Sequence, residues 1–152
     1  MIKRHGWILL FHACLVEQLQ KLNVASERAR RKDPEGYHGN ANVRLWRALT
    51  NLILETIPSD PSRDDYRQGN TLGSDFRHWR RAKIGRRFRL FFRYDSRSRT
   101  IIYAWVNDQH SLRAAGSKSD PYAMFQKMLK SGNPPDDWSA LIQASQADWD
   151  TD

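Results

Sequence analysis

The sequence predicts one α+β domain, in which an N-terminal strand and a pair of helices precede a mostly antiparallel β-sheet and further helices close the chain. Three observations predict this order. Apolar residues first recur at helical spacing, then alternate with polar residues between residues 79 and 106, and return to helical spacing after residue 120. The 152 residues are enough for one hydrophobic core, and we find no repeat, low-complexity tract or internal boundary.

The N-terminal third predicts a strand followed by a helical hairpin. Residues 7–12 are apolar at nearly every position, which is typical of a strand covered on both faces. Leucines then recur at helical spacing and predict a helix over about residues 13–31, before a turn at residues 33–36. A second apolar stripe covers residues 43–57 and ends at Pro58. Two antiparallel helices joined by a short turn form a helical hairpin.

Three short strands are predicted in the middle of the chain. Residues 59–73 are polar, contain Pro and Gly, and predict a loop. Residues 79–84, 88–94 and 100–106 are rich in alternating, aromatic or β-branched residues and are joined by short turns. This pattern predicts an antiparallel meander.

The C-terminal quarter predicts two helices and a tail. Asp120 fits a helix N-cap and Pro121 fits the first helical position, while Gly132 ends this helix. A short last helix carries Trp138. A single domain therefore spans residues 1–152, with an acidic tail from about residue 146 that is expected to be disordered.

Positive charge is concentrated in the predicted sheet. The chain has a net charge of +8, and the window from Arg77 to Arg99 holds ten Lys or Arg residues against one acid, Asp95. Nine of the ten are Arg, whose planar guanidinium suits phosphate groups. A polyanion is the favoured partner, and a solvated basic surface is the alternative.

Strand alternation predicts which of these residues share a face. In residues 88–94, the side chains at even positions are apolar or aromatic and would pack on the helical hairpin. The side chains at odd positions, Arg89, Phe91 and Arg93, would project into the open. Paired across the turn, the two strands would present one set together: Arg81, Lys83, Arg89 and Arg93, with Trp79 and Phe91 among them.

This set predicts an RNA-binding surface, because cations hold phosphates and aromatic rings stack on unpaired bases. Arg86 and Arg87, in the turn between the strands, would extend it. Trp105, on the third strand, would stack on a base or be a buried aromatic residue of the sheet. The alternative for Arg89 and Arg93 is exposed charge that prevents aggregation.

Other chemistries find little support in the residues. The five histidines show no metal-ligand spacing, no cysteine pair exists, and no phosphate loop or nucleophile elbow is present, so we expect neither a metal nor a cofactor. The lone Cys14 fits a small core residue better than a nucleophile. No apolar run is long enough for a membrane helix or a secretory signal, which predicts a cytoplasmic protein without membrane contact.

RNA can be cleaved without a metal, because its 2′-hydroxyl can attack the adjacent phosphate once its proton is removed. Clustered guanidiniums would stabilise the charge that develops. Lys83 is the candidate base, because neighbouring cations favour its neutral amine.

A series of short sequence words resembles the YhaV toxins, from about residue 6 to about residue 141. The words, specific in combination and weak alone, are Gly6-Trp7, His12, Lys32-Asp33-Pro34-Glu35, Tyr37, Thr71-Leu72-Gly73, Trp79, Arg81, Lys83, Gly85, the run at 88–94, the run at 105–108, Leu112-Arg113, Gly116, Lys118, Asp120, Tyr122, Phe125, the run at 127–129, Gly132, Pro134-Pro135 and Trp138.

YhaV toxins are part of the wider RelE group. The resemblance therefore implies a RelE-like fold, with a helical hairpin packed on a mostly antiparallel sheet, and a toxin that cleaves messenger RNA without metal, in association with the ribosome. It also implies a PrlF-type antitoxin with a swapped-hairpin, AbrB-like DNA-binding domain. The toxin and antitoxin would bind operator DNA together and repress their own operon.

The resemblance further implies catalytic roles for five residues: Arg81, Lys83, Arg89, Arg113 and Tyr122. Strand alternation selects the first three independently, whereas Arg113 and Tyr122 come from the resemblance alone, and Tyr122 also suits plain helix packing. His110 departs from the family pattern and is either an incidental loop residue, which we favour, or an added acid.

The sequence thus predicts an endoribonuclease toxin that inhibits translation and growth. Arg93 joins the arginines that hold the phosphate, Lys83 handles a proton, and Tyr122 orients or donates. One alternative is a basic module that binds ribosomal RNA without cutting it. Another is a ParE-type toxin that poisons gyrase, although such a toxin does not need an arginine-lined groove.

Overall fold

A computed structural model describes residues 1–108 and 120–149 of the chain. Six strands and five α-helices occur within these residues. In chain order they are β1 (Ile2–Arg4), β2 (Trp7–His12), α1 (Ala13–Lys32), α2 (Ala41–Asn51), α3 (Ile57–Ser59), β3 (Arg80–Ile84), β4 (Phe88–Asp95), β5 (Thr100–Val106), α4 (Pro121–Lys130), α5 (Trp138–Gln143) and β6 (Ser145–Gln146).

One mixed sheet organises the fold, with the strand order β1-β2-β5-β4-β3 and β6 paired to β2. The pair β2–β5 is parallel, and the other pairs are antiparallel. The predicted α+β class and the meander of β3, β4 and β5 are confirmed. Strands β1 and β6, which are only three and two residues long, are not predicted from the sequence.

A tight hairpin accounts for β1. His5 and Gly6 have φ values of 51° and 81°, the left-handed pair that a two-residue hairpin turn requires. Ile2 pairs with Leu9 across it. A glycine at the second turn position was the available signal for this strand.

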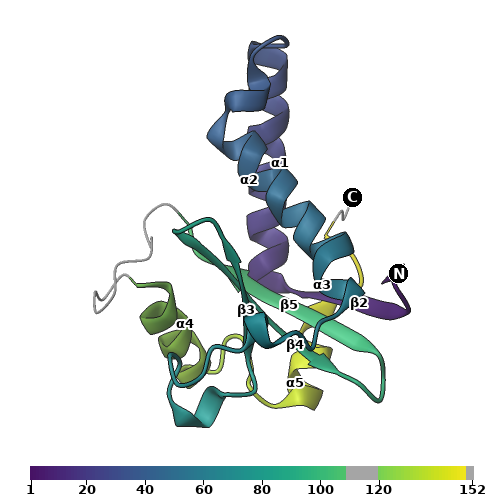
Figure 1. Ribbon diagram of the computed structural model, residues 1–152, viewed down its shortest axis with the longest axis vertical. Coiled ribbons are helices and arrows are strands. Elements are labelled where there is room, and N and C mark those ends of the chain that lie inside the picture. The colour runs from purple at the N-terminus through teal and green to yellow at the C-terminus, as the bar shows by residue number, and fades with distance from the viewer. Residues whose placement is uncertain (109–119, 150–152) are drawn as a thin grey trace.

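The helical hairpin of α1 and α2 rises from one side of the sheet, as predicted (Figure 1). The second helix is less regular than predicted, because α2 ends at Asn51 and a wider π-helical segment, Leu52–Thr56, leads into α3. Leu49, Ile53 and Ile57 are nonetheless all buried along one stripe.

The sheet is covered on both faces, by two separate hydrophobic cores. The first core lies beneath the helical hairpin and contains Leu9, Leu90 and Phe92. The second lies beneath α4 and α5, on the other side of the sheet (Figure 1), and contains Phe91 and Phe125. The expectation that the odd-numbered side chains of β4 project into the open is therefore wrong.

Residues 146–149, which fall in the tail predicted to be disordered, pack on the rest of the fold. Gln146 pairs with Phe11 in the sheet. The ring of Trp149 packs edge-to-face on Phe11, with 5.0 Å between centroids, and its carbonyl accepts a hydrogen bond from Gln20 Nε2 at 3.1 Å. One apolar ring that covers the core outweighs the acidic composition around it.

We predict that His12 makes the stability of the fold depend on pH. His12 is 3% exposed and caps α1, where its Nδ1 accepts a hydrogen bond from the backbone N–H of Cys14 at 3.2 Å. Burial lowers the pKa of His12. The unfolded chain therefore binds more protons as the pH falls through about 6.5, and stability is lost in that range.

The test substitutes His12→Asn, which keeps a capping acceptor but does not titrate. Urea unfolding at about pH 7.5, 6.5 and 5.5 should show a smaller loss of stability for this variant than for the wild type. His38→Asn, at an exposed histidine, is the matched control. Equal pH dependence of wild type and His12→Asn would contradict the assignment.

Candidate functional site

The register of β3 and β4 brings three of the predicted site residues together. Lys83 lies directly opposite Arg89, and Arg81 lies opposite Phe91 on the same face of the sheet. Arg89 is 7% exposed, whereas Lys83 is exposed to solvent. The juxtaposition of Arg81, Lys83 and Arg89 that strand alternation predicts is confirmed.

Tyr122, the residue expected only from the resemblance, completes this cluster. Its hydroxyl oxygen accepts hydrogen bonds from Arg81 Nε at 2.7 Å and Arg89 Nε at 3.3 Å. Tyr122 lies in the first turn of α4, where the carboxylate of Asp120 accepts from its backbone N–H at 3.1 Å and forms the predicted N-cap. We call Arg81, Lys83, Arg89 and Tyr122 the cationic cluster.

Arg89 is held by neutral acceptors. Its Nη1 donates to the carbonyl oxygens of Phe88 at 2.8 Å and Gly85 at 3.3 Å. Its backbone N–H donates to Asn107 Oδ1 at 2.6 Å, and the amide of Asn107 donates in turn to Arg87 O at 2.9 Å. The sequence pattern does not reveal this positioning role of Asn107, whose only signal is its place directly after a predicted strand.

The positive charge of the cluster is not neutralised by described acidic side chains. Among residues 1–108 and 120–149, none of Arg81, Lys83 and Arg89 forms a salt bridge. Uncompensated cations with their hydrogen-bond geometry already set are what an anion-binding site requires.

Arg93 lies four residues after Arg89 on β4 and makes a different set of contacts. Its guanidinium lies between two indole rings, 5.6 Å from the centroid of Trp79 and 5.2 Å from that of Trp138. Its Nη1 also donates to the carbonyl oxygen of Asp136. Burial lowers the pKa of Arg93. These contacts attach the segment before α5 to the sheet, and they favour a structural role over the predicted RNA contact.

The three rings considered for base stacking are buried, which for Trp105 agrees with its alternative interpretation as a buried aromatic residue of the sheet. Trp79 and Phe91 are 0% exposed and Trp105 is 8% exposed. Phe125 of α4 stacks on Phe91 at 4.3 Å and on Trp105 at 5.8 Å, so the helix occupies the surface that bases would have used. The prediction of an open aromatic surface is wrong, because the sequence pattern does not show that a second layer covers this face.

The remaining candidates fall into two groups. Arg86 and Arg87 are exposed in the β3–β4 turn, beside the cationic cluster. Arg113 and His110 lie outside the described residues. Within the described part, no three His, Cys, Asp or Glu side chains gather as they would around a metal ion, and no helix is long and apolar enough to span a membrane. Cys14 is half-buried, and burial raises the pKa of its thiol.

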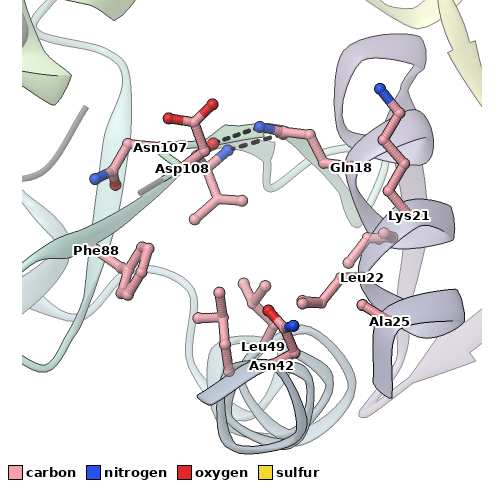
Figure 2. A pocket seen from close by; sticks show the side chains of 12 residues that line it. Gln18, Lys21, Leu22, Ala25, Asn42, Leu49, Phe88, Asn107 and Asp108 are labelled. Carbon is pink, nitrogen blue, oxygen red and sulfur yellow. Dashed lines mark hydrogen bonds between the residues drawn. The ribbon is translucent and has the colours of Figure 1, made fainter. Parts of the chain in front are cut away.

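Two hollows flank the β3–β4 hairpin. The first, shown in Figure 2, lies between the helical hairpin and the ends of β4 and β5, and Leu22, Leu49 and Phe88 give it a mainly apolar wall. Gln18 closes one side through hydrogen bonds to the backbone of Val106 (Figure 2). The second hollow is lined by Lys83 itself.

Comparison with known proteins places the chain in a class of enzymes. A family model described as a toxin with endonuclease activity, of a toxin-antitoxin system, matches residues 9–146. The chain belongs to this family, the YhaV toxins. An antitoxin is therefore its partner.

Two relatives from Escherichia coli show how much of the chain is shared. "Toxin YhaV" of strain O6:H1 is 41% identical over 144 residues, and "Ribonuclease toxin YhaV" of strain K12 is 40% identical over the same length. Each alignment covers 93% of this chain and 94% of the relative. No solved structure matches the chain.

We predict that Arg93 supports the fold and that its loss spares RNA binding. Arg93→Met removes a hydrogen bond and two cation–π contacts, so unfolding should become easier by about 1–3 kcal/mol. The slope of log affinity for single-stranded RNA against log salt should stay unchanged, whereas Arg81→Met should reduce its magnitude by about 0.7.

Arg97→Met, at an exposed arginine in the β4–β5 turn, is the matched control for stability. Urea unfolding and RNA titrations at several salt concentrations supply the two measurements. If Arg93→Met instead lowered the magnitude of the salt slope of RNA binding and left the free energy of unfolding unchanged, Arg93 would be an RNA contact and not a structural residue.

Proposed function

We propose that this toxin cleaves messenger RNA at the cationic cluster without a metal ion. The observation that carries the proposal is the convergence of Arg81 and Arg89 on one phenol oxygen, beside an exposed lysine without a partner among the described residues. The endonuclease activity of the family and the name of the K12 relative, a ribonuclease toxin, supply the reaction class.

In this proposal the 2′-oxygen of one nucleotide attacks the adjacent phosphorus, and the bond from phosphorus to the 5′-oxygen of the next nucleotide breaks. Lys83 handles a proton of this transfer. Arg81 and Arg89 donate hydrogen bonds to the phosphate oxygens as negative charge develops, which is the contribution that preset donors make best. Tyr122 orients both guanidiniums or donates a proton to the leaving oxygen, and Arg113 is proposed to join them.

The wider setting follows the family resemblance. We propose a RelE-like toxin that acts on translating ribosomes and inhibits growth, with a PrlF-type antitoxin that also binds operator DNA and represses the operon. The uncompensated cluster supports RNA over gyrase as the target, since a protein-binding toxin does not require it. A module that binds RNA without cutting remains the second candidate, and it is favoured only by the charge itself.

Lys83→Met is expected to abolish cleavage while the fold stays intact, because the side chain of Lys83 is exposed to solvent. The assay follows radiolabelled messenger RNA in EDTA, with and without translating ribosomes, beside a Lys83→Met, Arg89→Met double variant. Loss of a proton-transfer group of this kind lowers rates by about 10²–10⁴-fold.

Lys130→Met, at an exposed lysine at the far end of α4, is the control and should cut normally. Wild-type cuts that require added metal would contradict the metal-free mechanism. A Lys83→Met variant that cuts at the wild-type rate would show that Lys83 is not the base. Binding without any cut would favour the binding module.

The antitoxin is expected to inhibit by placing an acidic segment on the cationic cluster, since carboxylates would supply the missing negative charge. Acetylation of surface lysines in the free toxin and in the complex, read by mass spectrometry, tests this. Lys83 should be protected in the complex, and Lys21, on the rim of the apolar hollow in Figure 2, should stay reactive. Protection of Lys21 alone would assign inhibition to that hollow.

A further inference from the structure

A second hollow lies beyond the free edge of the sheet, next to the cationic cluster. It has a volume of about 530 Å³, and its walls include Leu52, Thr56, Arg63, Asp65, Tyr66 and Lys83. Volumes of this order are typical of small-molecule sites. β3 is the edge strand, and Arg67 bridges to it only at Arg80, so the Lys83 end of this edge faces the hollow.

Two residues connect this hollow with the cationic cluster. Lys83 is a member of the cluster and also lines the hollow. Arg81, whose Nε bonds Tyr122, also donates from Nη1 to the carbonyl oxygen of Asp65 at 2.7 Å. One guanidinium therefore connects the phenol of the cluster with the loop that forms the wall of the hollow.

The wall presents donors and acceptors side by side. Arg63 Nη2 donates to Asp65 Oδ2 at 3.0 Å, and its guanidinium lies 5.8 Å from the ring centroid of Tyr66. Tyr66 is itself buried edge-to-face against Phe92 at 5.4 Å. The side chains of Arg63 and Asp65 stay 48% and 76% exposed, so both can be reached by a ligand.

We propose that this hollow binds the base of the ribonucleotide next to the scissile phosphate, and that Arg63 and Asp65 read its edge. The inference rests on the proposed function, because a phosphate held at Lys83 places the neighbouring nucleotide within reach of the hollow. Arg63 offers only donors and ionised Asp65 only acceptors, so the pair discriminates bases by the order of donors and acceptors on their edges.

The test maps cleavage sites on an RNA pool with random sequence, for the wild type, Asp65→Asn and Arg63→Met. Asp65→Asn replaces one acceptor by a donor and should change the base preferred beside the cut by about tenfold, the effect of one good base contact. The readout is the distribution of bases beside the cut, normalised to the total cleavage of the pool by each variant. Asp64→Asn and Arg67→Met are matched controls, since that neighbouring pair lies outside the hollow.

A second measurement separates the two proposals. Selection of bound sequences from a 2′-O-methyl pool, which has no attacking hydroxyl, reports base preference without cleavage. If the wild type selects a base beside the bound phosphate and Asp65→Asn changes that choice, the inference stands even when no cut is seen and the proposed nuclease fails. If cuts occur but Asp65→Asn and Arg63→Met keep the wild-type preference in both assays, the inference is overturned and the nuclease stands.

Discussion

The packing of α4 on the sheet is the constraint on which the candidate site depends. Phe125 stacks on Phe91 at 4.3 Å and meets Trp79 edge-to-face at 5.0 Å, so the helix is held by a group of buried rings. Tyr122 lies three residues earlier on the same helix face. The packing of these rings therefore places the Tyr122 hydroxyl within hydrogen-bond distance of Arg81 and Arg89. The same packing closes the second face of the sheet, and the site lies where that cover ends.

Arg89 shows how a buried cation can be kept without an acidic partner. Burying a charge is costly unless hydrogen bonds replace its hydration. Two backbone carbonyls and a phenol oxygen provide those bonds, yet none of them carries a full negative charge. The guanidinium is thus oriented and solvated by the protein, while its charge stays available to an incoming phosphate. A carboxylate in the same place would stabilise the fold and weaken the site.

The sequence predicted the members of the site better than its surroundings. Period-two alternation is a property of the backbone, so it correctly placed Arg81, Lys83 and Arg89 on one face. It does not distinguish a face open to water from one covered by a second layer, and Phe91 between two arginines was the residue that could have raised the question. Contacts made by a loop carbonyl, such as that of Asp65 with Arg81, leave no trace in side-chain patterns.

The ten cations of the basic window do not all lie at the candidate site. Arg80, Arg93 and Arg99 lie over aromatic rings, 5.8 Å from Tyr94, 5.6 Å from Trp79 and 4.4 Å from Trp7. Their alkyl and guanidinium groups pack as well as carry charge. Five of the remaining cations, the three of the cluster with Arg86 and Arg87, gather at the turn end of the β3–β4 hairpin, whereas Arg77 and Arg97 are exposed elsewhere. The total charge of the window therefore overstates the size of the site, because only about half of its cations lie at the cluster and the adjoining turn.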